Sequence, residues 1–84
     1  MRKKIAILGS TGSIGKTIIN ILNDNKNEFD VKLLSADKDY KTLLNQANKY
    51  NVKNLIITNN KSFHLLKKKV SNKNINLFNN FNSL

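Results

Sequence analysis

The residues with the clearest chemical potential form one glycine-rich stretch, residues 7–17, which reads ILGSTGSIGKT. Its glycines stand at every third position, 9, 12 and 15, and they are the three glycines of the whole 84-residue chain, which contains no proline. Glycine is needed where φ is positive or where the backbone must lie against another group. This placement predicts a turn that binds a ligand, and two kinds of phosphate-binding turn fit it in part.

The first interpretation is the G-x-x-G-x-x-G turn of a dinucleotide-binding protein. There, the first glycine permits the bend after a strand, the second lets the backbone approach the pyrophosphate, and the third lets the following helix pack closely. The free amides and the positive end of that helix face the phosphates. We expect Thr11 and Ser13 to add hydroxyl hydrogen bonds and Ile14 to close the loop on the nicotinamide side.

The second interpretation is the phosphate loop of ATPases, G-x-x-x-x-G-K-[ST], because residues 15–17 read GKT. That spacing requires a glycine at position 10, where this chain has Ser10. The mechanism also needs a magnesium-binding carboxylate after a later strand, whereas the third predicted strand ends in ITN at residues 57–59. We therefore favour the dinucleotide turn, with a P-loop NTPase fragment and a stand-alone NAD(P)-sensing module as alternatives.

A dinucleotide turn needs a strand before it and a helix after it, and both are predicted. Residues 4–8 (KIAIL) are a short apolar run typical of a strand buried in a parallel sheet. After the turn, apolar residues recur at helical spacing, and Ser13 is placed to cap the start of the helix. The recurring residues are Ile14, Ile18, Ile21 and Leu22. Polar residues over 23–28 predict the end of this helix.

The remaining sequence repeats the alternation of strand and helix. We predict strands over residues 29–36, 52–58 and 75–78, and amphipathic helices over residues 40–50 and 63–70. This order predicts a Rossmann-like three-layer α/β/α fold with a parallel sheet and right-handed crossovers, β-α-β-α-β-α-β. Residues 79–84 add no further helix. We therefore expect a partly uncovered sheet, and residues 1–84 to be the amino-terminal part of a dinucleotide-binding domain.

Composition narrows the choice of partners and location. The net charge is +10, but lysine and asparagine are spread along the whole chain, which argues against a patch built for nucleic acid. There is no cysteine, no apolar run of the roughly 18 residues that a membrane span needs, and no export signal at the amino terminus. The single histidine, His64, has no second metal ligand nearby. We expect a cytoplasmic protein without nucleic-acid or membrane partners.

The run GSTGSIG after an apolar strand resembles the amino terminus of the 1-deoxy-D-xylulose 5-phosphate reductoisomerase family, NADPH-dependent enzymes of non-mevalonate isoprenoid biosynthesis, and the likeness continues to about Thr58. It implies NADPH contacts in the turn and at the end of the second strand, at Thr11, Gly12, Ser13, Ile14, Asp37, Lys38 and Asp39. The family usually reads Ala-Gly-Lys-Asn where this chain reads ADKD at 36–39. Asp37 should repel the NADP phosphate, whereas Lys38 should attract it.

The resemblance also implies what the family does as a whole. Its members rearrange and reduce the sugar phosphate 1-deoxy-D-xylulose 5-phosphate to 2-C-methyl-D-erythritol 4-phosphate, use a divalent metal (Mg or Mn), and form homodimers. The metal-binding carboxylates, the substrate contacts and the closing lid belong to parts of the family beyond residue 84. We therefore expect no catalytic and no metal-binding residue in this chain, and we predict that it is inactive by itself.

Overall fold

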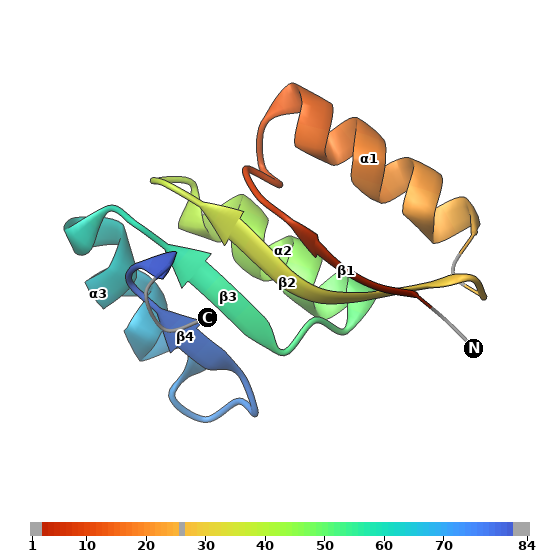
Figure 1. The fold of residues 1–84 in the computed structure, drawn as a ribbon. Helices are drawn as coiled ribbons and strands as arrows, with labels where there is room; N and C mark the ends of the chain where they lie inside the picture. The colour runs from red at the N-terminus through yellow and green to blue at the C-terminus, as the bar shows by residue number, and fades with distance from the viewer. Residues whose placement is uncertain (1–2, 26, 82–84) are drawn as a thin grey trace.

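The computed structural model describes residues 3–25 and 27–81, over which strands and helices alternate (Figure 1). The strands are β1 (Lys3–Ile7), β2 (Phe29–Ala36), β3 (Asn54–Ile57) and β4 (Asn76–Phe78), and the helices are α1 (Ser13–Asp24), α2 (Tyr40–Tyr50) and α3 (Asn60–Val70). Every strand and helix predicted from the sequence is present, and β2 has the predicted bounds.

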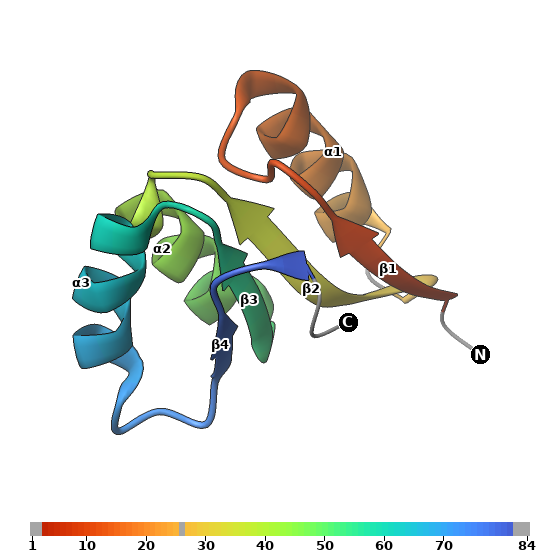
Figure 2. The same ribbon diagram turned by 60° about the vertical axis from the view of Figure 1, so that its left-hand side comes forward.

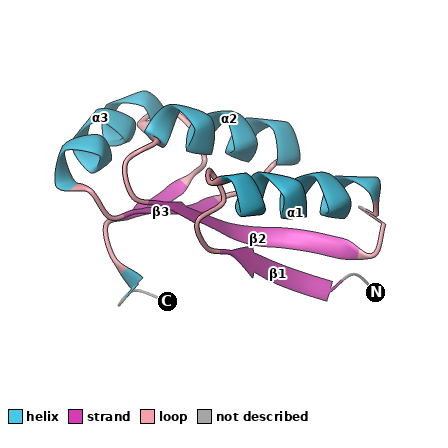
Figure 3. Cartoon of the chain, turned by 90° about the horizontal axis from the view of Figure 1, so that it is seen from above, coloured by secondary structure: helices cyan, strands magenta, loops and turns pink. Residues whose placement is uncertain are grey.

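The four strands form one parallel sheet in the order β1-β2-β3-β4. Each strand is added on the same side of the previous one, and parallel crossovers are right-handed, so every crossover helix must lie on the same face. Figure 3 shows α1, α2 and α3 together on one side of the sheet. The predicted Rossmann-like parallel α/β fold is confirmed. Of its three predicted layers, the described residues form two: the sheet and one layer of helices.

The core lies between the sheet and this helix layer. Leu34 of β2 and Leu55 of β3 point toward the helices, where they pack in one apolar cluster with Leu43 of α2 and Leu66 of α3. None of these four side chains is more than 1% exposed. Burial of each contributes about 2 kcal/mol of hydrophobic stabilisation. The two central strands, β2 and β3, are therefore held against α2 and α3 by a packed core.

The start of α1 differs from the prediction. The residue at the N-cap is Gly12, and no side chain caps this helix. Ser13 is already inside the first turn, where its carbonyl oxygen accepts a hydrogen bond from the Thr17 hydroxyl at 3.0 Å. The predicted cap at Ser13 is therefore wrong, because the chain enters the helix one residue earlier than the apolar spacing suggests.

The inward face of α1 also differs from the apolar pattern that predicted the helix. Its buried residues are Gly15 and Ile19, whereas Ile14 is 77% exposed and Ile18 and Ile21 are exposed too. Positions 15, 19 and 22 have the same helical spacing as positions 14, 18 and 21. Of the four residues whose spacing predicted the helix, only Leu22 packs against the core, because the inward row begins at Gly15, which has no side chain and gives no apolar signal.

Helices α2 and α3 begin with equivalent caps. Asp39 Oδ1 accepts a hydrogen bond from the Thr42 amide at 3.1 Å, and Asn59 Oδ1 accepts one from the Ser62 amide at 3.0 Å. Helix α2 ends at Tyr50, and the capping residue after it, Asn51, has a φ of +57° and takes the left-handed position often occupied by glycine. Polar side chains thus replace the glycines and prolines that this part of the chain lacks.

The turn predicted over residues 23–28 is tested only in part. Helix α1 continues to Asp24, and Lys26 lies outside the described residues. Residues 82–84, the end of the segment predicted to add no helix, also lie outside them. Among the described residues, no helix combines the length and apolar character that crossing a membrane would require.

Candidate functional site

The glycine turn connects the carboxyl end of β1 to the start of α1. Gly9 has a φ of +70°, which residues with a side chain rarely adopt. The Gly12 amide donates a hydrogen bond to the Gly9 carbonyl oxygen at 3.2 Å, and this bond closes the turn. The first glycine therefore makes the bend that the dinucleotide interpretation predicts.

Gly15 lies where α1 packs against the turn. A β-carbon at this position would lie 2.3 Å from the Gly9 carbonyl oxygen and 2.7 Å from Ser10 Cα. Both neighbours are backbone atoms, which cannot move aside as a flexible side chain can. The close packing predicted for the third glycine is present, and it is made against the turn itself.

Gly12 is not required by any packing within the chain. A β-carbon there would meet only the Gly9 carbonyl oxygen, at an ordinary 3.6 Å, and the φ of −75° is accessible to any residue. A group from outside the fold that approaches this backbone closely would account for a glycine here. Gly12 is thus the one glycine of the three that points to a ligand.

The first turn of α1 supplies hydrogen-bond donors beside Gly12. The first amides of a helix have no carbonyl partner within it, and α1 has neither a side-chain cap nor an acidic residue in its first turn. The positive end of the helix dipole adds to their attraction for anions. The structure brings together at this helix start the four predicted turn residues, Thr11, Gly12, Ser13 and Ile14.

The second predicted segment, Asp37 to Asp39, follows β2 at the same edge of the sheet as the glycine turn (Figure 2). All three side chains are exposed. Asp37 Oδ1 accepts a hydrogen bond from Thr58 Oγ1 at 2.6 Å, which ties it to the end of β3. Lys38 is the cation of this segment, and the Asp39 carboxylate caps its own helix, α2.

The charge of Asp39 is stabilised by its surroundings. Hydrogen bonds from Thr42 lower the pKa of the Asp39 carboxyl below its usual value, and the positive charges of Lys16 and Lys41 act in the same direction. Asp39 is therefore ionised at neutral pH. Lys16 belongs to α1, so the start of α2 lies near the positive charge of the neighbouring helix.

The turn is held in place by Ser10, Ser35 and Gln46, none of which was predicted to belong to the site. The Gly9 amide donates to Ser35 Oγ at 3.0 Å, and the Ser10 amide donates to the Ser35 carbonyl oxygen at 2.9 Å. Gln46 of α2 makes two further hydrogen bonds to Ser10. Ser10, which stands where the ATPase pattern requires a glycine, is thus a buried residue whose hydrogen bonds fix the turn to β2 and α2.

One sequence signal could have identified Gln46. It lies on the face of α2 that also carries Leu43, Ala47 and Tyr50, all of which pack in or against the core. A polar residue at a core position of an amphipathic helix needs a buried hydrogen-bond partner. The pattern alone gives no indication of which residue that partner is.

Lys16 is exposed on the surface of α1. It lines a groove between α1 and α2 together with Thr42, Asn45 and Gln46. In a P-loop NTPase the corresponding lysine reaches the phosphates held by the loop. The placement of Lys16 lends no support to the ATPase alternative.

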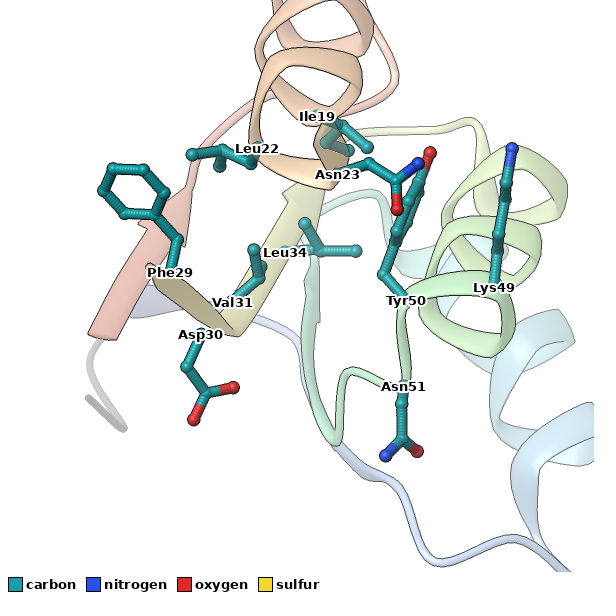
Figure 4. A pocket seen from close by; sticks show the side chains of 10 residues that line it. All are labelled: Ile19, Leu22, Asn23, Phe29, Asp30, Val31, Leu34, Lys49, Tyr50 and Asn51. Carbon is teal, nitrogen blue, oxygen red and sulfur yellow. The ribbon is translucent and has the colours of Figure 1, made fainter. Parts of the chain in front are cut away.

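A cavity of about 260 Å³ lies at the other end of α1 (Figure 4). Leu22, Val31 and Leu34 contribute apolar atoms to its lining, and Tyr50 reaches it from α2. The helices run antiparallel to the strands, so the ends of α1 and α2 lie at the amino ends of the strands. The cavity is therefore separate from the glycine turn and is not part of the candidate site.

The described residues offer no metal site. Within residues 3–25 and 27–81, no three His, Cys, Asp or Glu side chains are grouped so that they could hold a metal ion. His64 is exposed, and its ring lies in a T-shaped arrangement with the Phe63 ring, with centroids 5.6 Å apart. No metal-dependent step can be derived from this part of the chain.

Comparison with protein families gives a match over nearly the whole chain. The family model for 1-deoxy-D-xylulose 5-phosphate reductoisomerase matches residues 5–82. The reductoisomerase of Pelagibacter ubique is 46% identical over 82 residues, which are 98% of this chain and 21% of that protein. The enzyme of Buchnera aphidicola from Schizaphis graminum is 41% identical over 73 residues, 87% of this chain and 18% of that protein. The chain thus spans about one fifth of the length of the curated relatives that it matches.

Solved structures show the same fold. The reductoisomerase of Zymomonas mobilis in complex with NADPH superposes with a TM-score of 0.84 at 24% identity, covering 93% of this chain and 21% of that one. A reductoisomerase in complex with NADPH, fosmidomycin and magnesium gives a TM-score of 0.83 at 23% identity, covering 90% of this chain and 19% of that one.

Proposed function

The chain belongs to the 1-deoxy-D-xylulose 5-phosphate reductoisomerase family, and from that premise we propose that residues 1–84 form the amino-terminal part of its NADPH-binding domain. The observation that carries this proposal is the open backbone at Gly12, beside an uncapped helix start. Nothing inside the fold requires glycine there, and the amides of the first turn of α1 are donors for a phosphate.

In this proposal the pyrophosphate lies against the backbone of Gly12 and the first turn of α1. Thr11 and Ser13 add hydroxyl groups, and the exposed Ile14 covers the nicotinamide side. Lys38 attracts the additional phosphate of NADPH, with Asp37 and Asp39 beside it. When bound, NADPH supplies the hydride for a reduction, and the residues of this chain bind and orient it.

The activity of the family needs more than these residues. We propose that the rearrangement and reduction of 1-deoxy-D-xylulose 5-phosphate takes place only where a sugar-phosphate site and a divalent metal, Mg or Mn, complete the cofactor site. The 84-residue chain alone then binds NADPH weakly and turns over no substrate. A cytoplasmic location, a homodimeric assembly, and the absence of nucleic-acid and membrane partners belong to the same proposal.

Selective isotope labelling gives a direct test. Because the three glycines lie in the turn and in the first turn of α1, ¹⁵N-glycine labelling of this chain yields amide signals from the candidate site alone. We expect NADPH to shift the signals of Gly12 and Gly15, with weaker shifts for NADH, and ATP with magnesium to have little effect. Unmoved glycine signals at millimolar NADPH would rule out the proposed site.

Lys16→Ala provides the matched control for the remaining alternative. A P-loop lysine contributes directly to binding of the β- and γ-phosphates, so its removal would abolish ATP binding. In a dinucleotide site Lys16 lies on the helix surface, and its replacement should leave the NADPH-induced shifts nearly unchanged. A large loss of NADPH binding in this variant would contradict the proposed arrangement.

A further inference from the structure

A buried hydrogen-bond network connects the glycine turn to two other elements of the fold. Ser10, Ser35 of β2 and Gln46 of α2 are 0%, 3% and 9% exposed. Ser10 and Gln46 are 36 positions apart in sequence. Among the described residues, no buried side-chain nitrogen or oxygen lacks a hydrogen-bond partner, and this holds for every side chain of the network.

Gln46 contacts Ser10 through both atoms of its amide. Ser10 Oγ donates to Gln46 Oε1 at 2.8 Å, and Gln46 Nε2 donates to the Ser10 carbonyl oxygen at 2.8 Å. Only this orientation of the amide satisfies both groups, because a backbone carbonyl oxygen can accept but not donate. Gln46 therefore binds Ser10 in one orientation, and the carbonyl oxygen of Ser10 is held toward α2.

Ser10 in turn contacts the first turn of α1 and helps to position the backbone of Gly12. The α-carbon and carbonyl carbon of Ser10 are two of the three atoms closest to a β-carbon built at Gly15, so the first turn of α1 rests on this residue. On the other side, Ser35 holds the amides of Gly9 and Ser10. Gly9 then accepts the hydrogen bond from the Gly12 amide. Movement of Ser10 would therefore move both Gly12 and the start of α1.

We propose that Gln46 is a positioning residue for the cofactor, acting through Ser10 to keep the Gly12 backbone and the first amides of α1 aimed at the pyrophosphate. This inference rests on the proposed function, since it assigns a role within the same site. Gln46 itself lies behind the turn and makes no contact with the cofactor. Its effect is to preorganise the donors, so that binding does not have to order them.

Gln46→Glu tests this role with a pH-dependent readout. An ionised carboxylate can accept from the Ser10 hydroxyl but cannot donate to the Ser10 carbonyl oxygen, whereas the protonated acid can do both. The folded state then favours the protonated form and raises the pKa of the introduced carboxyl. The turn should be intact below that pKa and distorted as the pH rises through it.

We expect NADP⁺, which tolerates acid, to bind this variant about tenfold more weakly than wild type at pH 8, an effect of the size expected for losing one or two buried hydrogen bonds. The deficit should shrink toward pH 5. In the free variant, the ¹⁵N-glycine signals of Gly9, Gly12 and Gly15 should move away from their wild-type positions at pH 8 and return on acidification.

Asn45→Glu is the matched control, because it introduces the same charge at the adjacent, exposed position of α2. Any loss of affinity in this variant measures direct repulsion between the added carboxylate and the cofactor phosphates. The affinity of wild type, measured at each pH, corrects for titration of the cofactor itself. Should Gln46→Glu fail to fold, Ser10→Ala removes a single hydroxyl from the same pair and should weaken binding severalfold with an altered Gly12 signal.

The outcomes separate the two claims. If Gln46→Glu and Ser10→Ala both bind the cofactor as tightly as wild type does, and their glycine signals do not move, the role of Gln46 is overturned. The proposed function stays intact in that case. Equal losses in Gln46→Glu and Asn45→Glu would also overturn the role of Gln46, since the effect would then be charge alone. Absence of binding in wild type would overturn the proposed function itself.

Discussion

The glycine turn and the segment after β2 are predicted to bind the same ligand, but the fold constrains their residues to different degrees. In the turn, Gly9 needs its positive φ, Gly15 has no room for a β-carbon, and Ser10 is completely buried. In the second segment, Asp37 and Lys38 are exposed and no packing requires either side chain. Gly9, Ser10 and Gly15 therefore tolerate almost no change, whereas Asp37 and Lys38 can change without loss of the fold.

This difference follows from what each region would recognise. A pyrophosphate is common to all dinucleotide cofactors and is bound by backbone amides, which only the fold can position. The phosphate that separates NADPH from NADH is recognised by side chains at the end of the second strand. The proposed site thus assigns binding and selectivity to separate residues, and we expect each property to be alterable without the other.

The largest expected effect is that of Gly15→Ala on stability. Alanine in a helix is worth about 1 kcal/mol over glycine, but its β-carbon would lie 2.3 Å from the Gly9 carbonyl oxygen. Because the clash is with backbone, we expect the free energy of unfolding to fall by about 3 kcal/mol. Urea denaturation measures this change, and a Gly15→Ala chain as stable as wild type would show that α1 does not rest on the turn.

Gly12→Val should break binding and leave the fold nearly unchanged. A β-carbon at Gly12 has an ordinary contact of 3.6 Å, so little stability should be lost. Its branched side chain would occupy the space where the pyrophosphate is proposed to lie, and we expect NADPH affinity to fall roughly a hundredfold, about 2.7 kcal/mol. Fluorescence titration of NADPH measures the loss. Unchanged affinity would mean that the site lies elsewhere.

Asp37→Asn should shift selectivity without reducing binding. Asparagine removes the negative charge and keeps an oxygen that can accept from the Thr58 hydroxyl. We expect the ratio of NADPH to NADH affinity to rise by about tenfold at low salt, or roughly 1.4 kcal/mol. Asp24→Asn, at the far end of α1, is the control for net charge. A ratio that responds equally to both variants would remove Asp37 from the site.

The smallest effect concerns the caps of α2 and α3, which make the same kind of hydrogen bond to a helix amide but differ in charge. Asp39→Ala and Asn59→Ala should each cost about 1 kcal/mol at neutral pH. The folded-state pKa of Asp39 is lowered, so its contribution is present above the unfolded pKa and is lost as the pH falls through the folded value.

Thermal unfolding at pH 7 and about pH 2 separates the two caps. The difference between wild type and Asp39→Ala should shrink at the acidic pH, whereas the difference between wild type and Asn59→Ala should not, because an amide does not titrate. Parallel behaviour of the two variants would mean that the charge of Asp39 contributes nothing to the cap.

Several features of the fold and of the candidate site could be predicted because they are local. The φ of Gly9 and the absence of a β-carbon at Gly15 leave a direct trace in the sequence, and so does the apolar run that forms β1. The bounds of β2 were predicted correctly for the same reason. The inward face of α1 was not, because Gly15 contributes to packing by having no side chain and so leaves no apolar signal.

The sequence by itself determined the order of the elements, the parallel sheet and the place of the turn, since periodicity and glycine requirements act within a few residues. The tertiary structure alone decided that Ser10 meets Gln46, that Asp37 is tied to Thr58, and that all three helices share one face of the sheet. These pairings depend on which strands each crossover connection places next to one another. Hydrogen bonds between residues more than twenty positions apart carry no local pattern, so they became visible only once the strands were placed side by side.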